Sequence, residues 1–242
     1  MKHERRTWLN GYALPAFRVL ALLITALSSG VSGACAMTPL SAETGDVLIR
    51  VEAGNGWLHR FSLFQKNPPQ IALWMETEEG NFAGTLFVSR KTATGKWLFN
   101  GGNPRPEALP VWMARKDSTA IDGVTGATPV SSIDIALTPK PGVSPRRFVL
   151  FAEVNHSTDF NDAFPKNAEK GSPGYSGGEG GSGQPSLVYR CVVDLDAADS
   201  DSQFILVGHG SPDGSSGDIY ANLSEITGAL DIVKSISAEV IE

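Results

Sequence analysis

Cysteine is scarce in this sequence: its 242 residues include two, Cys35 and Cys191. Cys35 lies in an N-terminal segment with the pattern of a removable export signal. The mature chain would therefore keep one cysteine and form no intramolecular disulfide. Cys191 lies in a run of alternating apolar residues, a position typical of a buried, unreactive thiol that packs as a small apolar side chain.

Long hydrophobic runs and excess positive charge are also absent. The most apolar stretch, residues 19–27, is much shorter than the roughly 20 residues that span a hydrocarbon core, so a permanent membrane anchor is not expected. Acidic residues outnumber basic ones by 26 to 20. This balance argues against nucleic acid as a partner, because phosphates require clustered Lys and Arg. It argues equally against adhesion to an anionic membrane surface.

The N-terminus has the three parts of a bacterial export signal, in which basic residues precede an apolar core and a run of small residues. The small residues end in Ala34-Cys35-Ala36, the small-x-small pattern that signal peptidase recognises. We expect cleavage after Ala36, so that residues 1–36 are a signal peptide. The mature chain would then be periplasmic or otherwise extracytoplasmic. The basic residues ahead of the apolar core are Lys2, Arg5, Arg6 and Arg18.

Two alternatives concerning export stay open. Arg5 and Arg6 resemble the twin-arginine pattern of proteins that are exported already folded. Cys35 could instead be the lipidated first residue of a lipoprotein, with Ser32 where such signals usually carry Leu. The protein is therefore expected to be either soluble outside the cytoplasm or attached to a membrane by a lipid at Cys35.

The mature chain shows the periodicity of strands almost throughout, with breaks rich in Gly and Pro. Residues 78–81 have the chemistry of a hairpin turn. Short strands at such spacings predict an all-β fold, namely a single Ig-like antiparallel two-sheet sandwich domain over residues 37–242. The expected strands are residues 47–51, 71–76, 84–89, 132–137, 147–154, 186–193, 202–208 and 232–240.

Two long loops are expected between these strands. Residues 91–117 contain too many prolines for a central strand. Residues 166–184 are rich in Gly and Ser, and such a composition buries too little surface to order itself. We therefore expect residues 166–184 to form a flexible surface loop.

One segment carries a specific chemical pattern: Asp122-Gly-Val-Thr-Gly-Ala-Thr128. It resembles the motif by which a periplasmic flavin transferase recognises its protein substrates, as in the covalent-FMN subunits of sodium-pumping NADH:quinone reductase. The resemblance implies that Thr128 accepts FMN as a phosphoester and that Asp122, Thr125, Gly126 and Ala127 are recognition positions. The alternative is a turn between strands, because Asp-Gly and Thr-Gly are ordinary turn formers.

A second resemblance extends over most of the mature chain. Several separated blocks, in order, look like the predicted periplasmic family called domain of unknown function 2271. The resemblance implies export and an Ig-like sandwich. It also implies, as partners, a periplasmic flavin transferase and PepSY-type membrane redox proteins. The blocks are residues 74–76, 84–88, 105–112, 122–129, 151–156 and 183–189.

A cluster of oxygen and nitrogen ligands follows the expected strand at residues 147–154. His156, Asp159 and Asp162 could bind Ca²⁺ or a transition metal. Their spacing matches no standard calcium loop, and Asp is also among the commonest turn residues. A metal site at these residues is a weaker hypothesis than the flavin.

The leading functional hypothesis is an extracytoplasmic flavoprotein, or an accessory of a flavin system, that carries covalently bound FMN for electron transfer. No motif for nicotinamide or for a second cofactor is visible, so an electron carrier or binding module is favoured over a free-standing enzyme. One alternative is an envelope structural or binding module without a cofactor. Another is a metal-binding periplasmic protein.

Overall fold

The structure is a computed structural model and describes residues 45–60, 66–95, 104–116, 124–139, 144–197 and 201–241. All of these belong to one unit, Pro39–Glu242. The expected signal peptide, residues 1–36 with Cys35, lies outside the described residues. Among the helices described, none is long and apolar enough to cross a membrane.

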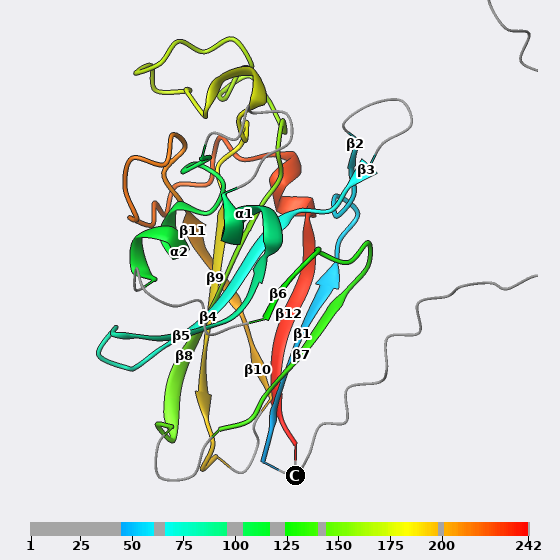
Figure 1. Cartoon of the computed structure of the whole chain (residues 1–242), viewed down its shortest axis with the longest axis vertical. Helices are drawn as coiled ribbons and strands as arrows, with labels where there is room; N and C mark the ends of the chain where they lie inside the picture. The colour runs from blue at the N-terminus through cyan, green and yellow to red at the C-terminus, as the bar shows by residue number, and fades with distance from the viewer. Residues whose placement is uncertain are drawn as a thin grey trace, which may run out of the picture. The chain divides into compact units, whose positions relative to one another are not determined.

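Four strands form the first sheet, in the order β10-β12-β1-β7, and every neighbouring pair is antiparallel (Figure 1). Its central strand β1 alternates as the sequence predicts, since Val47, Ile49 and Val51 are buried and Arg50 is exposed. The strands are β1 (Val47–Ala53), β7 (Ile133–Leu137), β10 (Ser202–Gln203) and β12 (Val233–Val240).

Six strands form the second sheet, in the order β11-β9-β8-β4-β5-β6. All neighbours are antiparallel except β5 and β6, which are parallel, so the expectation of a purely antiparallel fold is wrong. The reason is the long connection after β5, which brings the chain back to the sheet edge in the same direction. The strands are β4 (Gln70–Glu76), β5 (Phe82–Ser89), β6 (Val124–Gly126), β8 (Arg147–Asn155), β9 (Leu187–Asp194) and β11 (Ile205–His209).

The proline-rich segment that was not expected to form a central strand contains short helices. Helix α1 (Arg90–Thr94) ends at Gly95, whose φ of 63° is the left-handed conformation that favours glycine. Helix α2 (Pro110–Arg115) begins with Pro110, which suits a first helical position because its missing N–H has no partner there. The remaining elements are β2 (His59–Arg60), β3 (Lys66–Asn67), and the 3₁₀ helices η1 (Gly178–Gly180) and η2 (Gly228–Asp231).

One hydrophobic core is shared by the two sheets. It contains Ile49 and Ile236 from the four-stranded sheet and Leu73, Leu150 and Leu187 from the six-stranded sheet, all buried. Cys191 belongs to the same core, and burial raises the pKa of its thiol to about 12. The expectation of a buried Cys191 is therefore confirmed.

A second apolar cluster lies on the other face of the six-stranded sheet, where α2 packs. Trp74 and Phe151 stack with ring centroids 5.2 Å apart, and Val111 and Trp112 of α2 belong to the same cluster. Trp74 and Trp112 are fully buried and anchor this cluster. The six-stranded sheet thus has apolar packing on both faces.

The expected strand over residues 202–208 is in fact two strands in different sheets. Ser202 and Gln203 pair with β12, whereas β11 pairs with β9. The Phe204 amide donates to the Ile236 carbonyl at 2.9 Å, at the point where the chain leaves one sheet for the other. Continuous alternation in sequence cannot reveal such a change of sheet.

The Gly- and Ser-rich segment 166–184 contains no strand, but its last residues are fixed by hydrogen bonds. The Ser182 amide donates to the Ser176 carbonyl at 2.9 Å, and the Gln184 amide donates to the Asp159 carbonyl at 2.8 Å. Ser176, Ser182 and Gln184 are buried. Composition alone therefore misjudges this end of the segment, which is buried and held by hydrogen bonds.

Candidate functional site

The segment that resembles the flavin acceptor motif connects the two sheets. Thr125 and Gly126 lie in β6, at the open edge of the six-stranded sheet, and residues 127–132 lead into β7 of the four-stranded sheet. Thr125 and Ala127 are exposed, and Thr128 is half-buried. Asp122, the first recognition position, lies outside the described residues.

Gly126 stands in this segment without a structural need for glycine. It lies within β6 opposite Ser89 rather than in a turn, and its φ is outside the left-handed range. A Cβ added there would meet the Phe87 ring at 3.7 Å, an ordinary van der Waals distance. Thr125 and Gly126 thus lie in a strand, and the turn between β6 and β7 is formed by the residues that follow them, 127–132.

The hydroxyl of Thr128 lies close to the hydroxyl of Ser89. The two side-chain oxygens are 2.8 Å apart. Ser89 is buried at the end of β5, where its Oγ accepts a hydrogen bond from the Ile71 amide at 2.8 Å and donates to the Ile71 carbonyl at 3.2 Å. The half-buried Thr128 is thereby attached to the sheet edge through a rigid, buried side chain.

Two further hydrogen bonds fix the connection between the sheets to the end of β1. Trp57 Nε1 donates to the Pro129 carbonyl at 3.0 Å, and the Ala53 amide donates to Ser132 Oγ at 3.3 Å. Trp57 is 2% exposed, so it is a buried anchor and offers no face on which a flavin ring could stack.

The surroundings of Thr128 fit a phosphate-linked aromatic group. Val130 is 71% exposed, an unusually open position for a large apolar side chain. Helix α1 contacts β6 and carries Arg90 and Lys91, both with exposed side chains. The segment thus combines a hydroxyl with an exposed apolar side chain, and the neighbouring helix α1 carries cationic residues of the kind that suit a phosphodiester.

The expected metal-binding residues do not form a metal site in the structure. Within the described residues, no three His, Cys, Asp or Glu side chains gather closely enough to hold an ion. His156 is buried, with Nε2 2.8 Å from the Gly56 carbonyl oxygen, whereas Asp162 is exposed. Asp159 Oδ2 accepts from Gln184 Nε2 at 2.9 Å, and burial raises the pKa of Asp159.

The structure instead pairs His156 with His59, a partner that sequence reasoning missed. The two rings lie 5.2 Å apart. Burial lowers the pKa of His156 to about 4 from an ordinary 6.5; the hydrogen bond to Gly56 opposes this shift, and the charge of His59 adds to it. His156 is therefore a neutral, buried imidazole at neutral pH.

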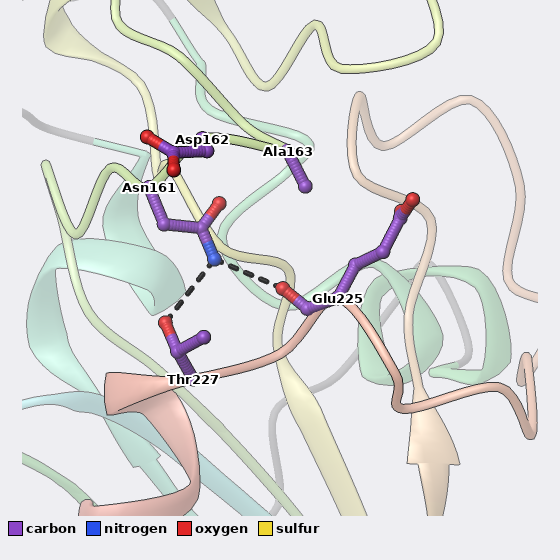
Figure 2. A pocket seen from close by; sticks show the side chains of 5 residues that line it. All are labelled: Asn161, Asp162, Ala163, Glu225 and Thr227. Atoms are coloured by element: carbon purple, nitrogen blue, oxygen red, sulfur yellow. Dashed lines mark hydrogen bonds between the residues drawn. The ribbon is translucent and has the colours of Figure 1, made fainter.

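Asp162 lines a shallow cavity of about 320 Å³ at the loop end of the molecule (Figure 2). Asn161 Nδ2 donates to the Glu225 carbonyl at 2.9 Å and to Thr227 Oγ1 at 3.2 Å, while its Oδ1 accepts from the Phe164 amide at 2.9 Å. Asn161 thus holds two loops together with all its polar atoms engaged. The cavity is lined by Asn161, Asp162, Ala163, Glu225 and Thr227.

A buried carboxyl on β8, which sequence reasoning also missed, holds helix α2 on the sheet. Glu153 accepts hydrogen bonds from the amides of Val111 and Trp112 at 3.2 and 2.8 Å and from Ser186 Oγ at 2.6 Å. Burial raises its pKa to about 7 despite these bonds and the charge of Arg115. The signal in the sequence was a single Glu inside an otherwise apolar strand.

The depressed pKa of His156 predicts a pH dependence. The unfolded chain binds a proton near pH 6.5 and the folded chain near pH 4, so the contribution of His156 is present above pH 6.5 and lost as the pH falls towards 4. We expect a loss of about 3 kcal/mol across this window. Urea unfolding of the wild type and His156→Gln between pH 4 and 8 measures this loss. It is the change with pH in the difference between their free energies of unfolding.

His209→Gln is the matched control, because His209 is half-buried and stacks on Tyr220 at 5.4 Å. That variant should keep the pH dependence of the wild type between pH 4 and 6.5. If the free energies of unfolding of the wild type and His156→Gln differed by the same amount at every pH, His156 would not be buried in its neutral form.

Comparisons with protein-family models, with curated proteins and with solved structures gave no match.

Proposed function

We propose that this chain is an extracytoplasmic electron carrier that holds FMN as a phosphoester on Thr128. The observation that carries the proposal is Gly126, which lies in an edge strand where the backbone does not require glycine and a side chain would fit. Because the fold does not need a glycine at this position, we attribute Gly126 to recognition by the modifying enzyme. The modifying enzyme must approach the backbone closely, and glycine allows this.

The position of Thr128 also supports the proposal. On its outer side, edge strand β6 pairs with no other strand of the described residues, so its backbone is accessible there. FMN bound there would supply one- and two-electron redox chemistry. The chain would supply the hydroxyl of Thr128, the apolar surface of Val130, and the positive charge of Arg90 and Lys91 near the phosphate.

The fold, export and partners that the sequence predicts are consistent with such a carrier. We infer that the two sheets with their shared core form an Ig-like sandwich, that residues 1–36 direct export, and that Cys35 is either removed with them or lipidated. The partners would be a periplasmic flavin transferase, which attaches FMN, and PepSY-type membrane redox proteins, which exchange electrons. The blocks that resemble domain of unknown function 2271 support the same context.

We expect Thr128→Ala to abolish FMN attachment and leave the fold intact, because it removes the acceptor oxygen and little packing. The full chain is co-produced in the periplasm with a flavin transferase, and flavin fluorescence on a denaturing gel and intact mass are measured. The wild type should gain the mass of FMN less one water. Thr138→Ala, which removes an exposed hydroxyl outside the motif, should be modified like the wild type.

Flavin retained in Thr128→Ala would remove Thr128 from the proposal. A wild-type band without fluorescence, at the mass of the plain polypeptide, would favour the alternative of a cofactor-free binding module of the envelope. The loop-end cavity beside Asp162 and Glu225 would then be the first place to look for a ligand.

A further inference from the structure

We infer that Ser89 is the positioning residue for the acceptor hydroxyl: it accepts a hydrogen bond from the Thr128 hydroxyl before modification and directs the nucleophilic lone pairs outwards. The inference rests on the proposed function. It is drawn from the 2.8 Å contact between the two hydroxyl oxygens and from the way in which buried Ser89 is itself held.

By distance alone either hydroxyl could be the donor of the Ser89–Thr128 hydrogen bond, and we assign its direction from the other partners of Ser89. Ser89 has one hydroxyl proton, and the Ile71 carbonyl 3.2 Å away can only accept. When Ser89 donates there, the bond with Thr128 forms only if Thr128 is the donor. The Ile71 amide, which donates to Ser89 Oγ at 2.8 Å, fixes the position of that oxygen. Both lone pairs of Thr128 Oγ1 are then free of Ser89.

The chemical step uses an outward lone pair of Thr128 Oγ1. A flavin dinucleotide supplies the FMN group: the bond from its FMN phosphorus to the nucleoside monophosphate breaks, and a bond from that phosphorus to Thr128 Oγ1 forms. The Thr128 proton leaves with the released nucleoside monophosphate. Attack needs an outward lone pair, and a hydroxyl held in one rotamer reaches the phosphorus far more often than a freely rotating one.

Ser89 also has a role after the transfer. The esterified Thr128 oxygen has lost its proton and can only accept. The Ser89 hydroxyl can then turn its proton from the Ile71 carbonyl to the ester oxygen, so that the same pair of side chains stays bonded. A residue at this position must therefore both accept and donate, which an alanine or valine cannot do.

Ser89→Thr and Ser89→Val test the inference, because threonine and valine have the same shape and only threonine keeps the hydroxyl. The time course of FMN attachment is followed by flavin fluorescence and intact mass, using purified full-length protein, a flavin transferase and a flavin dinucleotide. We expect Ser89→Val to be modified at least roughly tenfold more slowly than Ser89→Thr. Urea unfolding of both variants checks that they are folded.

Equal rates for folded Ser89→Val and Ser89→Thr, with the wild type modified, would overturn the role of Ser89 and leave the proposed function standing. A wild type that takes up no FMN would overturn both. If the added methyl prevents folding, Ser89→Ala replaces this pair. Attachment to Ser89→Ala at the wild-type rate overturns the inference, and a roughly tenfold loss supports it.

Discussion

Glu153→Ala is expected to lower the free energy of unfolding by about 4 kcal/mol at pH 5. The substitution leaves the amides of Val111 and Trp112 and the hydroxyl of Ser186 without their acceptor. Each buried donor that loses its partner costs roughly 1–3 kcal/mol, and the missing side chain adds a cavity. Urea unfolding followed by tryptophan fluorescence measures the loss, because α2 contains the buried Trp112.

The same substitution has a predicted pH dependence of known sign. The pKa of Glu153 is raised from 4.5 to about 7 by burial, so its contribution to stability is present below pH 4.5 and is lost as the pH rises through 7. The wild type should lose about 3 kcal/mol over this range, and the variant should not. The difference in the free energy of unfolding between the wild type and Glu153→Ala therefore becomes smaller from pH 5 to pH 8.

Glu239→Ala is the control for this prediction. Glu239 is exposed on β12, and its replacement should change stability by less than about 0.5 kcal/mol at either pH. A loss below about 1 kcal/mol in Glu153→Ala at pH 5 would show that Glu153 does not hold α2. A difference that grew with pH would contradict the raised pKa.

Helix α2 bears on the candidate site because it belongs to the connection between β5 and β6. That connection makes the two strands parallel and returns the chain to the sheet edge where Gly126 lies opposite Ser89. A buried acid that fixes α2 thus helps to fix the path of the chain into the acceptor segment. Loss of α2 packing would therefore also be expected to disturb the position of Thr128.

The strands were predictable because their signal is local. Alternation in residues 47–51 and the hairpin turn at 78–81 predict β1 and the β4–β5 pair from neighbouring residues alone, and the structure confirms them. Strand β6 was not predictable. It has three residues, too few for any periodicity, and it exists because a distant edge is available for pairing.

The same limit applies to side chains that meet across the sheets. The sequence identified Thr128 by a motif, but not Ser89, which approaches it from the end of another strand. It identified His156 but not His59, whose ring contact depends on how the loops close. Spacing along the chain reveals candidate groups, and only the packing of strands and loops reveals their partners.

Arg105→Met is expected to lower the free energy of unfolding by about 4 kcal/mol. Arg105 is 4% exposed, and its Nε donates to Glu107 Oε1 at 2.8 Å. Its Nη1 and Nη2 donate to the hydroxyls of Ser157 and Ser182 at 2.7 and 3.1 Å. One guanidinium thus connects the segment before α2 to both ends of the connection between β8 and β9. Removing it leaves the Glu107 carboxylate buried without this partner. A buried charge that loses its ion-pair partner strongly destabilises the folded state.

The double variant Arg105→Met Glu107→Leu separates this cost from lost packing. Because it removes both charges, it should recover about half of the loss of Arg105→Met, as buried pairs replaced by apolar side chains commonly do. Arg50→Met is the exposed control: its partner Asp134 is 46% exposed, and the loss should stay below about 1 kcal/mol. If the double variant lost as much free energy of unfolding as Arg105→Met and Glu107→Leu added together, the two charges would act independently, and the ion pair would not be what holds these segments together.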